Sequence, residues 1–191
     1  MVTLNRIYTR TGDGGVTRLA TGQPVSKASL RVAAYGDIDE TNACLGLVRL
    51  HTGADASLDA MLGRIQNELF DLGADLAAPA RPDEAEGSVL RILDSQVARL
   101  EREIDELNDA LEPLKSFVLP GGSPAAAALH LARTVCRRAE RTVTALTEAG
   151  ETVSPPAARY VNRLSDFLFV AARHANRGGA GEVFWKSGGT R

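Results

Sequence analysis

The stretch LDSQVARLEREIDELNDAL, residues 93–111, repeats apolar side chains at alternating steps of four and three residues. This spacing places them on one stripe of an α-helix, and it is typical of the seam along which helices pack in a left-handed bundle. The apolar positions are Leu93, Val97, Leu100, Ile104, Leu107 and Leu111. The intervening residues are mostly charged, which predicts a solvated outer face.

Comparable patterns occur on both sides of this stretch. The last two predicted helices begin with a serine cap followed by proline, and each ends before a glycine. No strand alternation is evident, so we predict an all-α, five-helix bundle of the ferritin-like up-down type. The predicted helices cover residues 30–52, 57–77, 88–111, 124–149 and 155–177. The chain is expected to form one domain over residues 1–191, with an N-terminal segment (1–29), a helical part (30–177) and a C-terminal tail (178–191).

Length and composition agree with one globular domain: 191 residues, 44% hydrophobic, with a net charge of −2. No stretch approaches the roughly 18 apolar residues of a membrane span, and the N-terminus lacks a signal-peptide pattern. We therefore expect a cytoplasmic protein without membrane contact. Two cysteines cannot form a disulfide framework, and Cys44 and Cys136 are expected to be reduced, buried thiols.

The distribution of charge is uneven. Arginine outnumbers lysine 19 to 3, and the net charge is +4 over residues 1–31, −2 over 32–50, −10 over 51–112 and +6 over 113–191. Since guanidinium groups suit phosphates and carboxylates, the two basic ends indicate a shared anion site. The alternative is the charge asymmetry common on solvated helices, and the acidic middle is interpreted as the outer faces of the second and third helices.

The N-terminal segment contains TRTGDGGVTR, residues 9–18. Its glycines let backbone N–H groups converge on an anion, while its hydroxyls and arginines add donors. The Walker A pattern is absent, and a flexible glycine turn is the alternative reading.

A second candidate cluster lies on the helix predicted over residues 124–149. Arg133, Arg137, Glu140 and Arg141 share one stripe, whereas Arg138 points roughly 140° away at 100° per residue. An anion site is one interpretation of this stripe. Salt bridges to acidic helices are the other.

On the last helix, Asn162, Asp166 and Phe169 share a face, and Phe117 lies in the loop before residue 124. Asparagine can bind an adenine edge or a ribose hydroxyl, and phenylalanine can form an apolar wall. Both phenylalanines could instead belong to the core.

The sequence contains no recognisable metal or nucleophile motif. The three histidines, His51, His130 and His174, fall outside metal-ligand spacings, and the Glu-x-x-His pairs of di-iron bundles are missing. No nucleophile elbow is present. Protein ligands for a metal therefore stay unknown at this stage.

Six motifs in order along the chain resemble the PduO-type ATP:cob(I)alamin adenosyltransferases, or corrinoid adenosyltransferases. They are IYTRTGDGG (7–15), VSK (25–27), YGDIDETN (35–42), FVLPGGS (117–123), HLARTVCRRAER (130–141) and YVNRLSDFLF (160–169). The resemblance implies a homotrimer with active sites at the subunit interfaces. It also implies that cob(I)alamin attacks the 5′ carbon of ATP, with Mg²⁺ accompanying the nucleotide, to give adenosylcobalamin and triphosphate. A cobalt reductase and a B12-dependent acceptor enzyme are implied as possible partners.

The resemblance also implies residue roles. The implied ATP contacts are Thr9, Arg10, Thr11, Gly12, Thr17, Arg18, Lys27, Arg137, Arg138, Glu140, Arg141 and Asn162. Arg133 would pair with Asp39 across the interface, while Phe117 and Phe169 would wall the corrin. The residues implied in catalysis are Asp39, Phe117, Arg133 and Arg137.

Two positions depart from the family pattern: Gly14 stands where lysine is common, and Thr41 where leucine is common. The missing lysine could weaken phosphate binding or leave it to Arg18 and Lys27. A nucleotide-binding regulator without turnover is a second hypothesis, which Phe117, Arg133 and Asp39 argue against. Nucleic-acid binding by the basic helix is a third, and the lack of interleaved aromatics and of an overall basic charge disfavours it.

Overall fold

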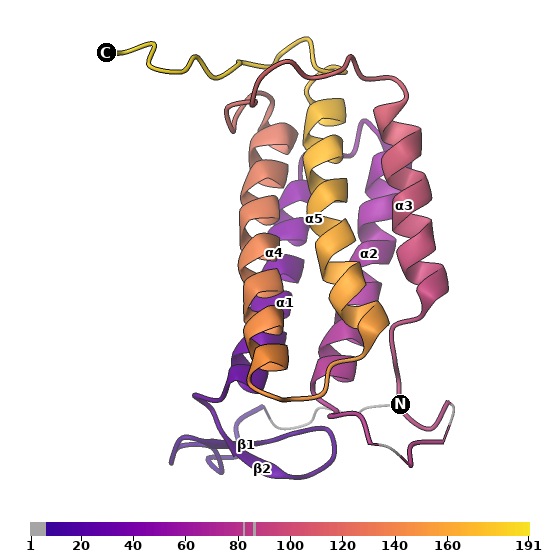
Figure 1. The fold of residues 1–191 in the computed structure, drawn as a ribbon, viewed down its shortest axis with the longest axis vertical. Helices are drawn as coiled ribbons and strands as arrows, with labels where there is room; N and C mark the ends of the chain where they lie inside the picture. The colour runs from indigo at the N-terminus through magenta and orange to yellow at the C-terminus, as the bar shows by residue number, and fades with distance from the viewer. Residues whose placement is uncertain (1–6, 82, 86) are drawn as a thin grey trace.

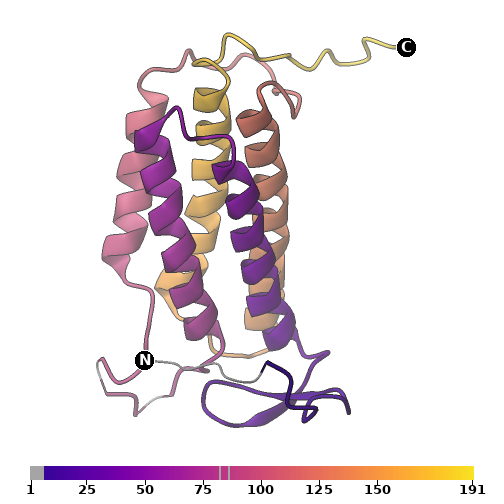
Figure 2. The ribbon, with the colours of Figure 1, turned by 180° about the vertical axis from the view of Figure 1, so that it is seen from behind.

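The computed structural model describes residues 7–81, 83–85 and 87–191. Five helices run alternately up and down, as Figures 1 and 2 show from opposite sides, which confirms the predicted bundle. Helix α1 packs against α2 and α4, while α5 packs against α3 and α4. The elements in chain order are β1 (Val16–Arg18), β2 (Pro24–Ser26), α1 (Leu30–Arg49), α2 (Ala56–Leu76), α3 (Asp94–Asn108), α4 (Pro124–Glu148) and α5 (Pro155–Ala175).

Side-chain caps set the start of four helices. The side chains of Ser29, Asp55, Ser123 and Ser154 each accept a hydrogen bond from the backbone N–H three residues further on. Such caps satisfy one of the donors that a helix N-terminus leaves free. None of the described helices combines the length and apolar character that a membrane span requires.

Helix α3 is shorter than the predicted 88–111. The buried carboxylate of Asp75 accepts hydrogen bonds from the Ile92 N–H (2.9 Å) and from Arg91 Nη1 (2.7 Å). These contacts hold residues 91–92 against the end of α2, so the helix begins only at Asp94. The apolar pattern continues on both sides of α3, through Leu93 before it and Leu111 after it. Periodicity alone therefore overestimated the length of the helix.

Two further boundaries differ from prediction. Helix α1 ends at Arg49 rather than near residue 52, because the chain turns so that Thr52 Oγ1 can donate to Asp59 Oδ1 at 2.8 Å. Helix α5 ends at Ala175 rather than at Arg177, whose φ of 59° is left-handed. A left-handed residue cannot continue an α-helix.

The helices were predicted from residue 30 onward, and both strands in the described part of the chain lie before that residue. Strands β1 and β2 form a small antiparallel hairpin before α1, with Thr17 opposite Val25. Three residues per strand are too few to produce a readable alternation. The hairpin gives the N-terminal segment a fixed shape below the bundle in Figure 1.

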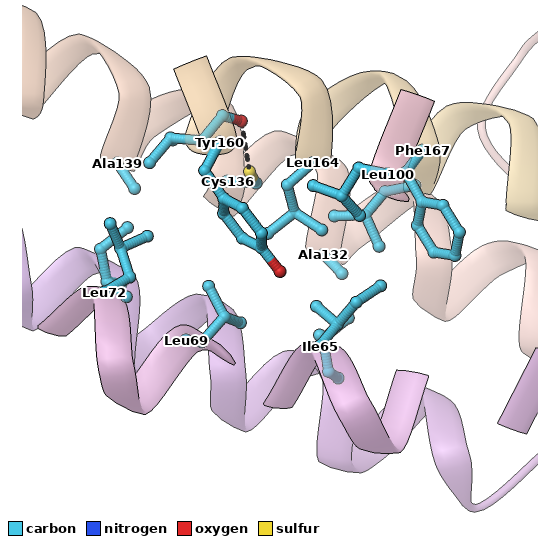
Figure 3. Packing of buried hydrophobic residues seen from close by; sticks show 14 of the residues in the cluster. Ile65, Leu69, Leu72, Leu100, Ala132, Cys136, Ala139, Tyr160, Leu164 and Phe167 are labelled. Atoms are coloured by element: carbon cyan, nitrogen blue, oxygen red, sulfur yellow. Dashed lines mark hydrogen bonds between the residues drawn. The ribbon is translucent and has the colours of Figure 1, made fainter. Parts of the chain in front are cut away.

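The core fills the space between the helices. Figure 3 shows Tyr160 and Phe167 of α5 packed among leucines and small side chains of the neighbouring helices. Cys136 is fully buried, as expected, and its thiol donates to the Val161 carbonyl at 3.5 Å. Burial raises the pKa of the Cys136 thiol. Cys44 is only partly buried, so the prediction holds for one of the two cysteines.

The acidic middle of the chain is not entirely a solvated face. Glu68 is 5% exposed and accepts hydrogen bonds from the Tyr160 hydroxyl (2.7 Å) and from Arg99 (2.9 Å). Asp75 is 2% exposed. Buried carboxylates need such partners, and charge counting along the sequence could not show which acids would have them.

Candidate active site

The N-terminal segment encloses a cavity of about 650 Å³ beside the β1–β2 hairpin. Of the described residues, all that line it come from residues 8–27. The lining contains every predicted ATP contact of that segment: Thr9, Arg10, Thr11, Gly12, Thr17, Arg18 and Lys27. The cavity therefore combines three cationic side chains and several hydroxyls with one carboxylate, Asp13, a composition whose net positive charge suits a polyanion.

The local backbone explains how these donors converge. Arg10 adopts a left-handed φ of 64°, an uncommon conformation for a residue with a side chain. Its guanidinium lies 5.6 Å from the centre of the Tyr8 ring, a contact that sequence reasoning missed. The Thr9 and Thr11 hydroxyls are 2.8 Å apart, so both face the same space.

Gly12 and Lys27 are in close contact. A Cβ added at Gly12 would lie 2.9 Å from Lys27 Nζ and 3.3 Å from the Val16 carbonyl oxygen. Lys27 is held in this place because its backbone N–H donates to the Gly15 carbonyl at 2.9 Å. The glycine thus makes room for an ammonium group at the cavity wall.

A second polar cluster lies where α4 faces α5. Asn162 Nδ2 donates to Glu140 Oε1 at 2.7 Å, and the guanidinium of Arg137 lies 3.9 Å from Glu140. Half of the Arg137 side chain is exposed, and Arg141 is exposed one turn further on. The predicted stripe is therefore real, and Arg137 keeps donors available for a ligand.

Asp166 also belongs to this cluster. The charges of Arg163, Glu140 and Arg137 act on its carboxyl group, which agrees with the predicted common face. Burial is the largest effect on this group and raises its pKa, and the nearby arginines only partly oppose it.

Arg138 points to the other side of α4, as its angular position predicted. It pairs with Glu40 of α1 and, at 3.4 Å, with Asp37, whose second oxygen accepts from the Thr142 hydroxyl at 2.6 Å. In a single chain Arg138 is therefore occupied in the α1–α4 contact. The salt-bridge alternative describes this arginine, whereas Arg137 has only a long contact with Glu140 of its own helix (3.9 Å) and a half-exposed side chain.

A third cluster lies nearer the start of α4. Phe169 is partly buried, and its ring meets the His130 ring edge-on at 6.4 Å and the Arg133 guanidinium at 5.9 Å. His130 Nδ1 and Arg133 Nε are both buried without a hydrogen-bond partner among the described residues. Burial lowers the pKa of both groups, with smaller contributions from neighbouring positive charge. His130 is three residues before Arg133, a spacing that could have signalled its place in this cluster.

Phe117 projects from the loop before α4. Its side chain is exposed (75%), which excludes the core reading for this residue in the single chain. Its ring lies 6.1 Å from that of Trp185 in the C-terminal segment, a neighbour that the sequence did not reveal.

Asp39 lies elsewhere, on the α1–α2 face. It lines a mainly apolar groove of about 530 Å³ together with Tyr35, Phe70 and other side chains. The Phe70 side chain is 71% exposed. Each cluster is thus formed within one chain. Among the described residues, however, Asp39 does not contact Arg133, and the N-terminal cavity is not lined by the α4 stripe.

A built metal centre is not part of this arrangement. Within the described ranges, no group of three or more His, Cys, Asp or Glu side chains could hold a metal ion. His174 Nε2 lies 2.8 Å from the Asp55 carboxylate at the end of the bundle, so this histidine has a structural partner.

Fold and clusters together define the class: a helical-bundle protein with surfaces suited to a strongly anionic ligand and, in the loop before α4, an exposed phenylalanine. The chain belongs to the cobalamin adenosyltransferase family, whose family model matches residues 7–175.

Individual relatives agree over nearly the whole length. The corrinoid adenosyltransferase of Mycobacterium leprae is 48% identical, covering 97% of this chain and 98% of that protein. The corrinoid adenosyltransferase of Bacillus subtilis is 44% identical, with coverages of 93% and 91%. A variant of the PduO-type ATP:corrinoid adenosyltransferase from Lactobacillus reuteri, solved with cobalamin and ATP, superposes with a TM-score of 0.87 at 38% identity and covers 95% of this chain and 97% of that one.

Proposed function

We propose that this protein transfers the 5′-deoxyadenosyl group of ATP to the cobalt of cob(I)alamin. The electron pair of Co(I) attacks the 5′ carbon, a Co–C bond forms, and the C–O bond to the triphosphate breaks with its electron pair. The products are adenosylcobalamin and triphosphate. The observation that carries the proposal is the cavity lined by Arg10, Arg18 and Lys27 in a chain of this family.

The clusters suit the charge changes of this reaction. Negative charge develops on the leaving triphosphate, so preorganised cations and N–H donors directed at it lower the barrier. The N-terminal cavity and the Arg137 stripe supply such groups, with Glu140 and Asn162 available for the nucleoside. Because the metal centre is itself the nucleophile, no side-chain base is required.

The aromatic residues suit the corrinoid end. In this proposal Phe117 occupies the lower axial side of the corrin and excludes its axial ligand, which favours a four-coordinate Co(II) that is easier to reduce. Phe169 provides a second wall. The exposure of Phe117 supports this role, because a large apolar side chain in contact with water gains from covering by a ligand.

The active site is proposed to form between subunits of a homotrimer. Three observations support this. Among the described residues, those that line the N-terminal cavity come from one segment, and Arg133 Nε is buried without a hydrogen-bond partner. Asp39 lies in a mainly apolar groove. A neighbouring copy would place Asp39 against Arg133 and close the cavity with its α4 stripe. Repeated head-to-tail contacts of this kind close into rings.

The remaining parts of the proposal rest on the family. Residues 1–29 are assigned to nucleotide binding, 30–177 to the helical framework and 178–191 to the tail. Mg²⁺ is expected to arrive with ATP, held mainly by phosphate oxygens. A cytoplasmic location, a cobalt reductase and a B12-dependent acceptor enzyme complete the expected setting.

An anaerobic assay with chemically reduced cob(I)alamin and MgATP tests the activity. We expect the absorbance change of adenosylcobalamin formation and one triphosphate per corrinoid. ATP binding without either product would instead identify a nucleotide-binding regulator.

Replacing Phe117 tests the corrinoid role separately. In Phe117→Ala, the KM for ATP should be unchanged, while the rate with a corrinoid that enters as cob(II)alamin should fall about tenfold or more because the corrin is no longer positioned. Leu119→Ala, in the same loop, is the matched control and should retain the rate. Equal losses toward both substrates in Phe117→Ala would mean that Phe117 is mainly structural.

A further inference from the structure

The C-terminal segment returns across the end of the bundle and pairs with the loop that carries Phe117 (Figure 1). The Leu119 N–H donates to the Val183 carbonyl at 2.8 Å, and the Trp185 N–H donates to the Phe117 carbonyl at 2.8 Å. The Ser116 hydroxyl donates to the Trp185 carbonyl at 2.9 Å. The backbone of Phe117 is therefore fixed by residues that lie nearly 70 positions later in the chain.

A buried ion pair anchors this segment to α5. Arg173 Nε donates to Glu182 Oε1 at 2.6 Å, and the two side chains are only 5% and 2% exposed. Arg173 Nη2 also donates to the Glu112 carbonyl at 2.9 Å, so the same guanidinium holds the start of the Phe117 loop. Burying two charges is costly unless they are well paired, so this contact specifies one position of the segment.

Asn176, the C-cap residue of α5, forms a second anchor. Its Oδ1 accepts from the Ser123 N–H at 3.1 Å, at the other end of the Phe117 loop. A Cβ added at Gly122 or Gly181 would lie 2.3 or 2.6 Å from this oxygen. The loop and the C-terminal segment thus approach the amide so closely that only glycine fits on either side.

We propose that Arg173 and Glu182 are positioning residues for the corrinoid step. By clamping the C-terminal segment to residues 112–123, the pair holds Trp185 against Phe117 and directs the Phe117 ring toward the corrin. Arg173 and Glu182 do not touch the reacting atoms. This inference rests on the proposed role of Phe117. It adds that the position of Phe117 depends on an ion pair outside the N-terminal cavity and outside the Arg137 stripe.

Trp185 provides a direct measurement, because it is the only tryptophan in the chain. Its fluorescence reports whether the segment is docked against Phe117. Glu182→Gln keeps the size of the side chain and removes its charge, leaving Arg173 buried beside a neutral amide. Glu103→Gln is the matched control, since Glu103 forms a comparable part-buried pair with Arg64 (2.5 and 2.6 Å) between α2 and α3.

In Glu182→Gln we expect the Trp185 emission to shift to longer wavelength and to become more accessible to a quencher. The corrinoid kcat/KM should fall about tenfold, because small misplacements of a positioning group cost one to two orders of magnitude. The KM for ATP should change by less than about twofold, since the nucleotide contacts lie elsewhere. Glu103→Gln should leave emission and both kinetic constants as in the wild type.

Gly181→Ala keeps the proposal testable if Glu182→Gln fails to fold. It leaves the charges intact and drives a methyl group against Asn176, and it should produce the same shift in emission with the same selective loss toward corrinoid. A shifted emission with normal corrinoid kinetics, or equal losses toward ATP and corrinoid, would overturn the positioning role. Failure of the proposed role of Phe117 is distinguishable, because it would appear as normal corrinoid kinetics in Phe117→Ala itself.

Discussion

At the residue scale, the position of the Lys27 ammonium depends on the absence of a side chain at Gly12. Gly12→Ala should displace the Lys27 ammonium, because the new Cβ would lie 2.9 Å from it. The displaced atom is the end of a flexible side chain, so we expect the melting temperature to stay unchanged and the KM for ATP to rise about threefold to tenfold through loss of a charged contact.

Gly14→Ala is the control for this prediction. Nothing lies within 4 Å of a Cβ at Gly14, so steady-state kinetics should remain those of the wild type. Equal effects of the two substitutions would show that loop flexibility, rather than the position of Lys27, is what matters.

Arg137 is the cation of the α4 stripe whose donors remain available. In Arg137→Ala, kcat/KM for ATP should fall about a hundredfold or more, because phosphate charge in the transition state loses a fixed partner. Arg102→Ala removes an exposed arginine from α3 and should leave turnover intact. Near-normal kinetics for Arg137→Ala would remove it from the proposed site.

Short motifs nominated these residues as candidates, and helical angles correctly separated Arg137 from Arg138. The contact between Gly12 and Lys27 could not be predicted, because it depends on a hairpin whose strands are too short to read. The pairing of Arg173 with Glu182 was equally hidden. A loop and a glycine-rich tail carry no periodicity that indicates which side chains will meet.

At the element scale, Asp75 joins three segments. Its carboxylate binds Arg91, the Ile92 backbone and the Ser154 hydroxyl (2.8 Å), which ties the end of α2 to the start of α3 and the cap of α5. Asp75→Ala should lower the free energy of unfolding by about 3 kcal/mol, because it leaves the buried Ile92 N–H and the Ser154 hydroxyl without their acceptor and removes one of the carboxylates paired with Arg91.

Urea unfolding followed by circular dichroism measures this difference. Asp94→Asn is the matched control, since Asp94 pairs with Arg159 at an exposed site (76% and 48%) where ion pairs contribute less than about 1 kcal/mol. If both variants lost a similar free energy of unfolding, Asp75 would contribute no more to stability than an exposed ion pair does.

Helix number, helix order and the caps of the last two helices were predictable, because serine and proline at helix starts act locally. The start of α3 was not, because a distant carboxylate on α2 holds residues that would otherwise continue the apolar stripe. Element boundaries set by tertiary contacts are the part of a fold that local patterns describe least well.

At the scale of the whole molecule, the two basic ends of the sequence correspond to two separate surfaces. The basic N-terminal cavity and the basic stripe of α4 are separate surfaces of one chain. In the proposed trimer, one copy supplies the cavity and its neighbour supplies the stripe. The uneven charge of the sequence suggests a shared anion site, but composition contains no information on which copy a residue faces.

Mixed oligomers test this arrangement. Lys27→Ala damages the cavity and Arg137→Ala damages the stripe, so each variant alone should be nearly inactive toward ATP. When the two are co-expressed in equal amounts, about a quarter of the interfaces should combine an intact cavity with an intact stripe and recover activity. Mixing either variant with itself is the control. Absence of recovery in the mixed sample would place both halves of the site in the same chain.

The separation between framework and loops has a consequence for how such a protein can change. Every member of the buried core cluster lies between Ala34 and Ala172, so residues 7–29 and 176–191 contribute nothing to it. The segments proposed to bind the ligands can therefore vary in sequence without repacking the bundle. Exchanging the tail together with residues 112–123 as one unit offers a route to altered corrinoid preference, whereas exchanging either alone would break the contacts that join them.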